Sequence, residues 1–205
     1  MSGIIAQNSG RHTGLVKASS GGGGVWNLIK TYTASGDSDL SFVDGTDGVD
    51  FTAYDEFVFK FISIHPSASS YLGYNTSTDG GSNYNNTKTT TFFIAYNGES
   101  AGPNLHQDGA DNRDLAQETG DVHLISSVGT DNDQVCSGHL CLYNPNSTTF
   151  VKHFIATVNT YSGDDYSQEI FSAGYSNTTS AVDAVRFQMS SGNIDAGTIS
   201  MYGIS

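Results

Sequence analysis

Basic residues are scarce in this chain of 205 residues. Lysine and arginine total 8 against 21 aspartate and glutamate residues, which gives a formal net charge of −13. A protein with this much negative charge repels phosphate groups, and we therefore do not expect nucleic acid as a partner. Anionic membrane surfaces are disfavoured for the same reason. The sequence also lacks an apolar run of about eighteen residues, which a membrane-spanning helix would need.

Cysteine is almost absent, and the two that occur, Cys136 and Cys141, are five residues apart. Two cysteines are too few for a disulfide framework. Spacing alone leaves open whether both are reduced or whether they close a small hairpin. The N-terminus also lacks the basic and then apolar plan of a secretory signal. A protein made in the cytoplasm without an export signal fits both facts.

Motifs for enzymatic chemistry are missing too. The sequence has no G-x-S-x-G nucleophile motif, and no pair of carboxylates stands out as the acid and base of a glycosidase. The glycine-bearing segment 79–83 does not stand between a strand and a helix, as a phosphate-binding loop would. We therefore expect neither an enzyme nor a bound cofactor.

Metal ligands are present but not in a typical arrangement. The acidic turns could offer oxygen ligands to calcium, although neither fits the EF-hand pattern and aspartate is also a common turn former, so calcium stays the lesser alternative. The histidines and cysteines that could offer nitrogen and sulfur ligands are not spaced as in known zinc sites, so we predict no zinc site. The residues concerned are Asp44, Asp47, Asp50, Asp131 and Asp133 for calcium, and Cys136, His139, Cys141 and His153 for zinc.

What the chain does contain is strand-forming sequence. The segment EFVFKFISI, residues 56–64, places Phe57, Phe59 and Phe61 on one parity and mostly apolar residues on the other. A period of two predicts a strand with the phenylalanines in a core and the opposite face partly covered. The pair His65-Pro66 is expected to end this strand. We interpret it as the central strand of the fold.

The rest of the chain repeats this pattern. Glycine numbers 24, and many asparagine, serine and threonine residues favour short strands joined by tight turns over helices. The polar stretch 97–120 is predicted to be a long loop, functional or at an interface. We therefore predict an all-β protein, a single jelly-roll-like antiparallel β-sandwich over residues 25–205. Its other strands are expected at 25–34, 40–43, 71–75, 89–96, 122–128, 138–144, 150–160, 169–175, 182–189 and 198–204.

Residues 1–24 differ from the rest in composition. They are small and polar with isolated apolar residues, carry Arg11 and Lys17, and end in four consecutive glycines. Such a segment cannot bury enough surface to fold alone. It is either a disordered tail or an extended arm with a glycine hinge that orders against a partner, and its positive charge beside an acidic body favours the arm. The anchor residues of the arm would be Ile4, Ile5, Leu15 and Val16.

Tyrosines in or beside polar loops suggest a sugar-binding surface. Aromatic faces next to amides and carboxylates suit sugar rings, although tyrosines at the rim of a sheet commonly have their hydroxyls in water and no ligand. The candidate glycan contacts are Tyr71, Tyr74, Tyr84, Tyr161 and Tyr166.

Three stretches carry a resemblance to a known group of proteins. They are MSGIIAQNSGRHTGLVKA at the start, TTTFFIAYN with STTFVKHFIAT in the middle, and SAVDAVRFQMSSGNIDAGTISMYGI at the end. Together they resemble small β-rich structural proteins of marine tailed bacteriophages, including cyanophages. The resemblance implies a jelly-roll-like sandwich on the outside of the virion, on the capsid or the tail, and often a homotrimer. It supplies no catalytic residues.

Residues and resemblance together predict a bacteriophage virion structural protein. We expect an external capsid decoration or cement-type appendage, assembled in the host cytoplasm and docked through its N-terminal arm onto major capsid or tail proteins. The alternative is a tail-associated receptor-binding module that recognises a glycan on the host surface.

Overall fold

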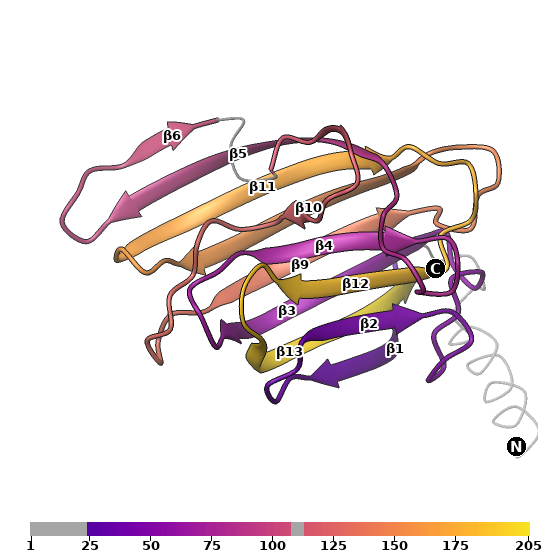
Figure 1. Ribbon diagram of the computed structural model, residues 1–205, viewed down its shortest axis with the longest axis horizontal. Coiled ribbons are helices and arrows are strands. Elements are labelled where there is room, and N and C mark those ends of the chain that lie inside the picture. Colours follow the sequence, from indigo (N-terminus) through magenta and orange to yellow (C-terminus); the bar gives the residue numbers. More distant parts are fainter. Residues whose placement is uncertain (1–23, 108–112) are drawn as a thin grey trace, which may run out of the picture.

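The computed structural model describes residues 24–107 and 113–205, which form two antiparallel sheets packed face to face (Figure 1). The predicted all-β sandwich is therefore confirmed. Within these two ranges no residue is helical, and accordingly no helix is long and apolar enough to cross a bilayer. The predicted anchor residues Ile4, Ile5, Leu15 and Val16 lie outside the described residues.

The larger sheet has nine strands and runs the full width of the molecule. The predicted central strand, here β3, is an interior strand of this sheet, third in its order and flanked by β13 and β9. In spatial order the strands are β1 (Trp26–Thr33), β13 (Ile194–Ile204), β3 (Glu56–Pro66), β9 (Cys136–Tyr143), β10 (Lys152–Tyr161), β11 (Tyr166–Ser176), β5 (Lys88–Gly98) and β6 (Asn104–His106), with β7 (Ala116–Glu118) also paired to β5.

The smaller sheet has four strands in the order β2 (Asp39–Val43), β12 (Ala184–Met189), β4 (Leu72–Ser77) and β8 (Val122–His123). In Figure 1 it lies in front of β3, β9 and β13, whereas β5, β10 and β11 extend above it. The chain alternates between the sheets, with β1 and β3 in the large sheet and β2 and β4 in the small one. Strands β1 to β4 therefore lie alternately on the two sides of the core, whereas β9, β10 and β11 are consecutive in sequence and adjacent in the large sheet.

Aromatic side chains fill the space between β3 and β12. Phe57, Phe59 and Phe61 are almost fully buried, as their period predicts. Phe187 of β12 meets two of them, with ring centroids 5.3 Å from Phe59 and 5.1 Å from Phe61. Its ring also lies 5.8 Å from that of Tyr74 on β4. Phe187, together with Phe42 of β2, whose ring lies 5.2 Å from that of Phe59, thus packs the small sheet onto the central strand.

The end of β3 departs from the predicted alternation. Ile64 was expected opposite the phenylalanines, yet it is fully buried with them. The reason is a bulge between Phe61 and Ile64, where Ser63 adopts a positive φ of 50° and the register shifts. The strand also continues to Pro66, two residues beyond the predicted end, and pairs there with Ile194.

Residues 97–128 are only partly as predicted. The expected loop 97–120 includes β6 and β7, and the expected strand 122–128 is paired as a strand only over β8. This segment contributes side chains to the core because the small sheet does not reach β5 and β11. Its buried apolar residues, which join Ile94 and Ile170 in one hydrophobic core, are Leu115, Val122, Leu124, Ile125 and Val128.

The two cysteines lie on opposite faces of β9. An odd separation of five residues gives opposite parity in a strand. Cys136 points into the core, and burial raises the pKa of its thiol to about 12. Cys141 is half-buried on the outer face, and both thiols are free. In this fold the two residues therefore cannot form a disulfide with each other.

Truncation of Phe187 to alanine should destabilise the protein strongly. The substitution removes the ring that packs the small sheet onto β3, so we expect a loss of about 3–5 kcal/mol in the free energy of unfolding. Phe93→Ala is the matched control, because Phe93 is 46% exposed and should cost less than about 1.5 kcal/mol. Urea denaturation followed by circular dichroism measures both. Equal losses for the two variants would contradict this description of the core.

Candidate functional site

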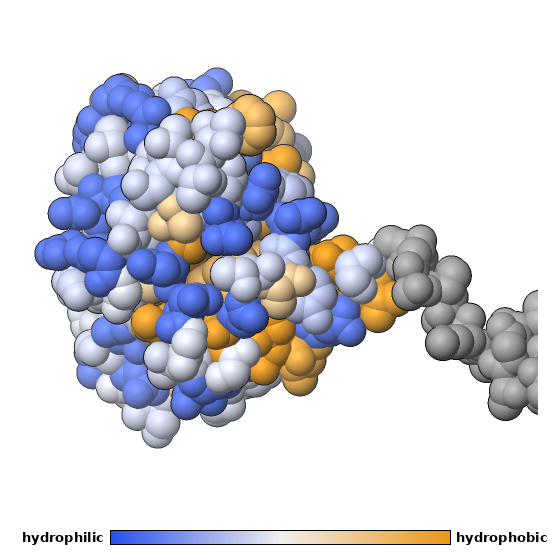
Figure 2. Space-filling model, turned by 90° about the vertical axis from the view of Figure 1, so that its right-hand side faces the viewer, coloured by the Kyte–Doolittle hydropathy of each residue, from blue (hydrophilic) through white to orange (hydrophobic). Residues whose placement is uncertain are grey.

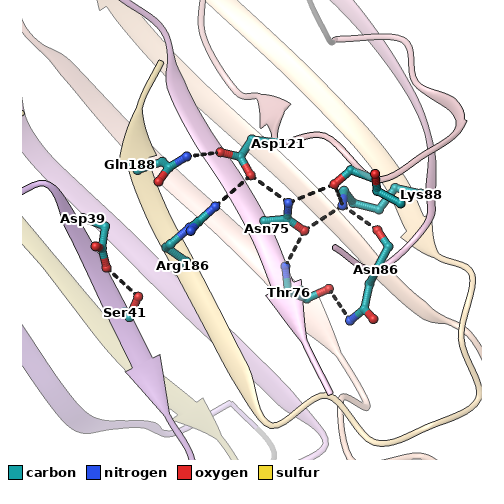
Figure 3. A network of polar contacts seen from close by, with 10 residues as sticks. Asp39, Ser41, Asn75, Thr76, Asn86, Lys88, Asp121, Arg186 and Gln188 are labelled. Carbon is teal, nitrogen blue, oxygen red and sulfur yellow. Dashed lines mark hydrogen bonds and ion pairs between the residues drawn. The ribbon is translucent and has the colours of Figure 1, made fainter. Parts of the chain in front are cut away.

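The outer face of the small sheet carries a network of polar side chains rather than an open apolar surface (Figure 3). Val185 and Phe187 of β12 point into the core, so Arg186 and Gln188 point outward. On the neighbouring strand Asn75 pairs with Arg186. Asp121 is the residue directly before β8. Because Tyr74 of β4 pairs with Val122 of β8 in antiparallel register, Asp121 lies opposite Asn75.

Asp121 is the hub of this network. One carboxylate oxygen accepts hydrogen bonds from Asn75 Nδ2 at 2.7 Å and from Arg186 at 3.3 Å, and the other accepts one from Gln188. The Arg186–Asp121 ion pair is mostly shielded from solvent, with 24% and 17% of the two side chains exposed. Partial burial makes such a pair stronger than a surface salt bridge.

Lys88, the first residue of β5, reaches the same network from the large sheet. Its side chain is fully buried, and its amine donates to Asn75 Oδ1 at 2.7 Å, to the Asn86 carbonyl at 2.6 Å and to the Thr119 carbonyl at 3.4 Å. Burial lowers the pKa of Lys88 to about 8, and the positive charge of Arg186 adds to this, although Asp121 acts in the opposite direction. Lys88 is thus a lysine that is neutral in part near physiological pH.

A polar pocket of about 630 Å³ opens beside the network. Its floor includes Tyr84, whose ring centroid lies 4.5 Å from the guanidinium of Arg186. Ser41 donates a hydrogen bond to Asp39 at 2.7 Å on the opposite wall. Hydroxyl, amide, carboxylate and guanidinium groups beside an aromatic ring are the groups that recognise sugars. The other lining residues are Val43, Gly81, Ser82, Asn83 and Asn85.

The predicted glycan tyrosines do not form one site. Tyr84 lines the polar pocket, but Tyr74 is fully buried in the core, where burial raises the pKa of its hydroxyl. The prediction for Tyr74 is therefore wrong, because this residue faces inward on β4. Tyr71 stands before β4, at the opposite end of that strand from Tyr84, and its ring stacks on that of His123 at 4.7 Å.

Tyr161 and Tyr166 flank the turn between β10 and β11 and line two separate pockets. Tyr161 donates to Asp165 at 3.0 Å, and this hydrogen bond raises the pKa of the phenol to about 12. Tyr166 packs edge-on against Tyr96, with centroids 5.4 Å apart. The pockets have volumes of about 360 and 340 Å³, and neither includes a residue of the Tyr84 pocket.

The acidic turns use their carboxylates locally. Asp44 accepts from the Phe51 amide, Asp50 accepts from the Thr52 amide and hydroxyl, and Asp47 pairs with Lys30 at 2.8 Å. Across residues 24–107 and 113–205 no group of three or more histidine, cysteine, aspartate or glutamate side chains is placed to hold a metal ion. Turn chemistry accounts for these aspartates.

The outer face of the large sheet is a second candidate site and carries exposed apolar side chains beside a polar row that includes Lys60, His139 and Thr157. One row across it runs Leu28, Tyr202, Val58, Cys141, Ile155 and Ala173, each opposite the next in register. We call this surface the apolar face. Its exposed members, each between 46% and 65% exposed, are Trp26, Leu28, Ile62, Phe93, Leu105 and Ile155.

Other contacts extend this surface in both directions. The amine of Lys60 lies over the ring of Trp26 at 5.2 Å, and Phe93 stacks on Phe171 with centroids 4.6 Å apart. A shallow apolar pocket of about 460 Å³ lies around Ile155, Ala173 and Tyr175. Figure 2 shows hydrophobic residues in orange on the right of the view, where the described chain begins.

Sequence reasoning missed the polar network entirely. Its members come from β4, β5, β12 and the segment before β8, so no local motif joins them. The one available signal was a lysine and an asparagine in otherwise strand-forming segments of a chain poor in lysine, at Lys88 and Asn75.

Comparison with known proteins does not identify a family for this chain. No protein-family model, no curated protein and no solved structure matches it.

Proposed function

We propose that this protein is a structural subunit of a bacteriophage virion, an external decoration of the capsid that acts by assembly. The observation that carries the proposal is the apolar face of the large sheet. Every large hydrophobic side chain that is exposed in the described ranges lies in a strand of that sheet or within two residues of one. Exposed apolar surface gathered on one side is typical of a protein–protein interface.

The partner of this face is a second copy of the same chain. The body of the protein is strongly acidic, so copies repel one another wherever charged surfaces meet. The apolar face has few charged side chains, and those on its strands include Lys60, Glu56 and Glu169. Contact through this face buries apolar area while it keeps the acidic surfaces apart. A homotrimer is the proposed assembly, as the resemblance to phage proteins implies.

The topology is compatible with this role. The strand orders β1-β13-β3-β9 and β2-β12-β4-β8 place successive strands in alternate sheets, which supports the jelly-roll-like arrangement. Strands β10, β11 and β5 widen one sheet beyond the other. The widened sheet offers its outer face as an extended flat surface.

Ile155→Glu should break the assembly. Ile155 is 51% exposed in the middle of the apolar row, so the change places a charge in the interface without disturbing the core. We expect the wild type to be oligomeric and the variant monomeric by light scattering coupled to size exclusion. Thr179→Glu adds the same charge in the exposed turn after β11 and should leave the mass of the oligomer unchanged. A monomeric wild type would contradict the proposal.

Residues 2–20 are proposed as the anchor to the virion. They include two basic residues and no acidic one, so residues 21–205 carry a formal charge of −15. Deletion of residues 2–20 should leave the oligomer intact and abolish binding to virions prepared without this protein, measured by co-sedimentation. Normal binding of the truncated protein would show that the anchor lies elsewhere.

Glycan binding is a second candidate function, favoured by one observation: the polar pocket places the Tyr84 ring and the Arg186 guanidinium beside Asp39 and two asparagines. Such a pocket would recognise a saccharide through its hydroxyls and one ring face. The protein would then serve in adhesion to the host surface.

Tyr84→Ala should lower the affinity for a bound glycan about tenfold, because it removes the stacking surface. The measurement is binding of the wild type and the variant to an array of surface polysaccharides, followed by titration of the best ligand. Tyr161→Ala is the control, since Tyr161 lines a different pocket. A wild type that binds nothing on the array, or a variant of unchanged affinity, would exclude this function for the pocket.

A further inference from the structure

A buried lysine, a buried asparagine and a carboxylate are in direct contact where the two sheets meet. Lys88 is 0% and Asn75 is 1% exposed, and Lys88 Nζ lies 2.7 Å from Asn75 Oδ1. On its other side the Asn75 amide donates to Asp121 at 2.7 Å and to the Thr119 carbonyl at 3.2 Å. Figure 3 shows the three side chains in a line, with Asn75 in the middle.

We propose that Lys88 and Asn75 condense into an intramolecular isopeptide bond, with Asp121 transferring the proton. The amine of a buried lysine and the carboxamide of an asparagine need no cofactor for this reaction, which is nucleophilic acyl transfer. The bond would join β4 of the small sheet to the first residue of β5 in the large sheet.

The amine meets the first requirement of the reaction. A nucleophile must be neutral, and an exposed lysine is almost entirely protonated at pH 7. Burial lowers the pKa of Lys88 to about 8, with Asp121 and Arg186 as the charged groups that also act on it. The protonated amine donates to the Asn75 side chain and to two backbone carbonyls, which hold the nitrogen beside the amide group. The neutral amine keeps two of these three hydrogen bonds, and its lone pair is then free to attack Cγ of Asn75.

The amide meets the second requirement. Asn75 Oδ1 accepts a hydrogen bond from the Thr76 backbone N–H at 2.9 Å as well as from Lys88. This N–H is placed to stabilise the negative charge that develops on Oδ1 in the tetrahedral intermediate, as in an oxyanion hole. In a buried site such a donor has a larger effect than in water.

Asp121 is the group that transfers a proton during the reaction. The lone pair of Nζ forms a bond to Cγ of Asn75, and the Cγ–Nδ2 bond breaks with its electron pair leaving on Nδ2. One proton leaves Nζ and one is gained by Nδ2, so the products are a secondary amide and ammonia. Asp121 contacts Nδ2 and not Nζ, so it can act only once the new bond holds Nζ on Cγ beside Nδ2; there the carboxylate takes the proton from Nζ and passes it to the departing Nδ2.

Arg186 and Gln188 act as positioning residues. They hold both oxygens of Asp121 and so fix the carboxylate beside the amide nitrogen. The other fully buried lysine, Lys152, has no such surroundings. Its amine donates to the carbonyls of Ser147, Phe150 and Thr178 and to no side-chain amide in the described residues. The reactive arrangement is therefore particular to Lys88.

The test is the intact mass of the full-length protein, denatured after incubation slightly above pH 8 until the mass is constant. We expect a mass lower than the sequence mass by one molecule of ammonia, and a digest in which the peptides containing Asn75 and Lys88 are joined. The full sequence mass would overturn the proposal and show a plain hydrogen-bonded network. Loss of ammonia located at any other asparagine would overturn it as well.

Single substitutions test the roles of Lys88, Asn75 and Asp121 in the reaction. Lys88→Arg and Asn75→Ala should each retain the full mass, and Asp121→Asn should slow the loss of ammonia at least about a hundredfold. Asn86→Ala is the matched control, because its side-chain amide contacts Thr76 and not the Lys88 amine, and this variant should still lose ammonia. Reaction at the wild-type rate in Asp121→Asn would exclude the proton-transfer role of Asp121.

Discussion

The packing of Phe187 against the phenylalanines of β3 is the contact on which the two-sheet structure depends. Each sheet is apolar on its inner face and would expose that face if the other were absent. Phe187 meets Phe59 and Phe61 of β3, and its neighbour in the small sheet, Phe42, also meets Phe59 with centroids 5.2 Å apart, so this aromatic cluster seats the small sheet on the central strand. Edge-to-face contacts between aromatic rings have a preferred geometry, and therefore fix position as well as burial. The same contact determines which residues of each sheet lie on its outer face.

The sequence predicted most of the sheet elements because pleating has a strict period. Alternation in β3, β9 and β12 correctly separated Phe59, Leu140 and Phe187 from their outward neighbours. It failed where the backbone leaves the regular strand, as at Ser63, since this bulge has a positive φ at a serine, a residue type that does not indicate one. It also failed in residues 97–128, which look polar but supply core residues to the part of the large sheet that the small sheet leaves uncovered.

The candidate sites were less predictable, for a different reason. The tyrosines near polar loops suggested a sugar-binding surface, but the position of a residue in the strand alternation decides whether it faces solvent. Tyr74 faces the core, and its neighbour Asn75 faces outward. The network around Asp121 joins positions up to 113 residues apart, from Asn75 to Gln188, and only strand pairing brings them together. A buried lysine such as Lys88 has no sequence signature, because its environment is made entirely by other segments.

The two outer faces of the sandwich differ in how far their chemistry is satisfied within the chain. On the small sheet, the carboxylate of Asp121 has partners for both oxygens, and the amine of Lys88 has three acceptors. Most of these polar groups are paired within the chain, although the buried Nε of Arg186 has no hydrogen-bond partner among the described residues. On the large sheet, side chains such as Leu28 and Ile155 remain exposed in a row with no covering element among the described residues. The large sheet therefore offers apolar area whose burial against another protein would gain free energy, whereas the small sheet offers polar groups beside an aromatic ring. This difference in surface chemistry is the physical reason for proposing assembly through the large sheet, and ligand recognition or cross-linking on the small one.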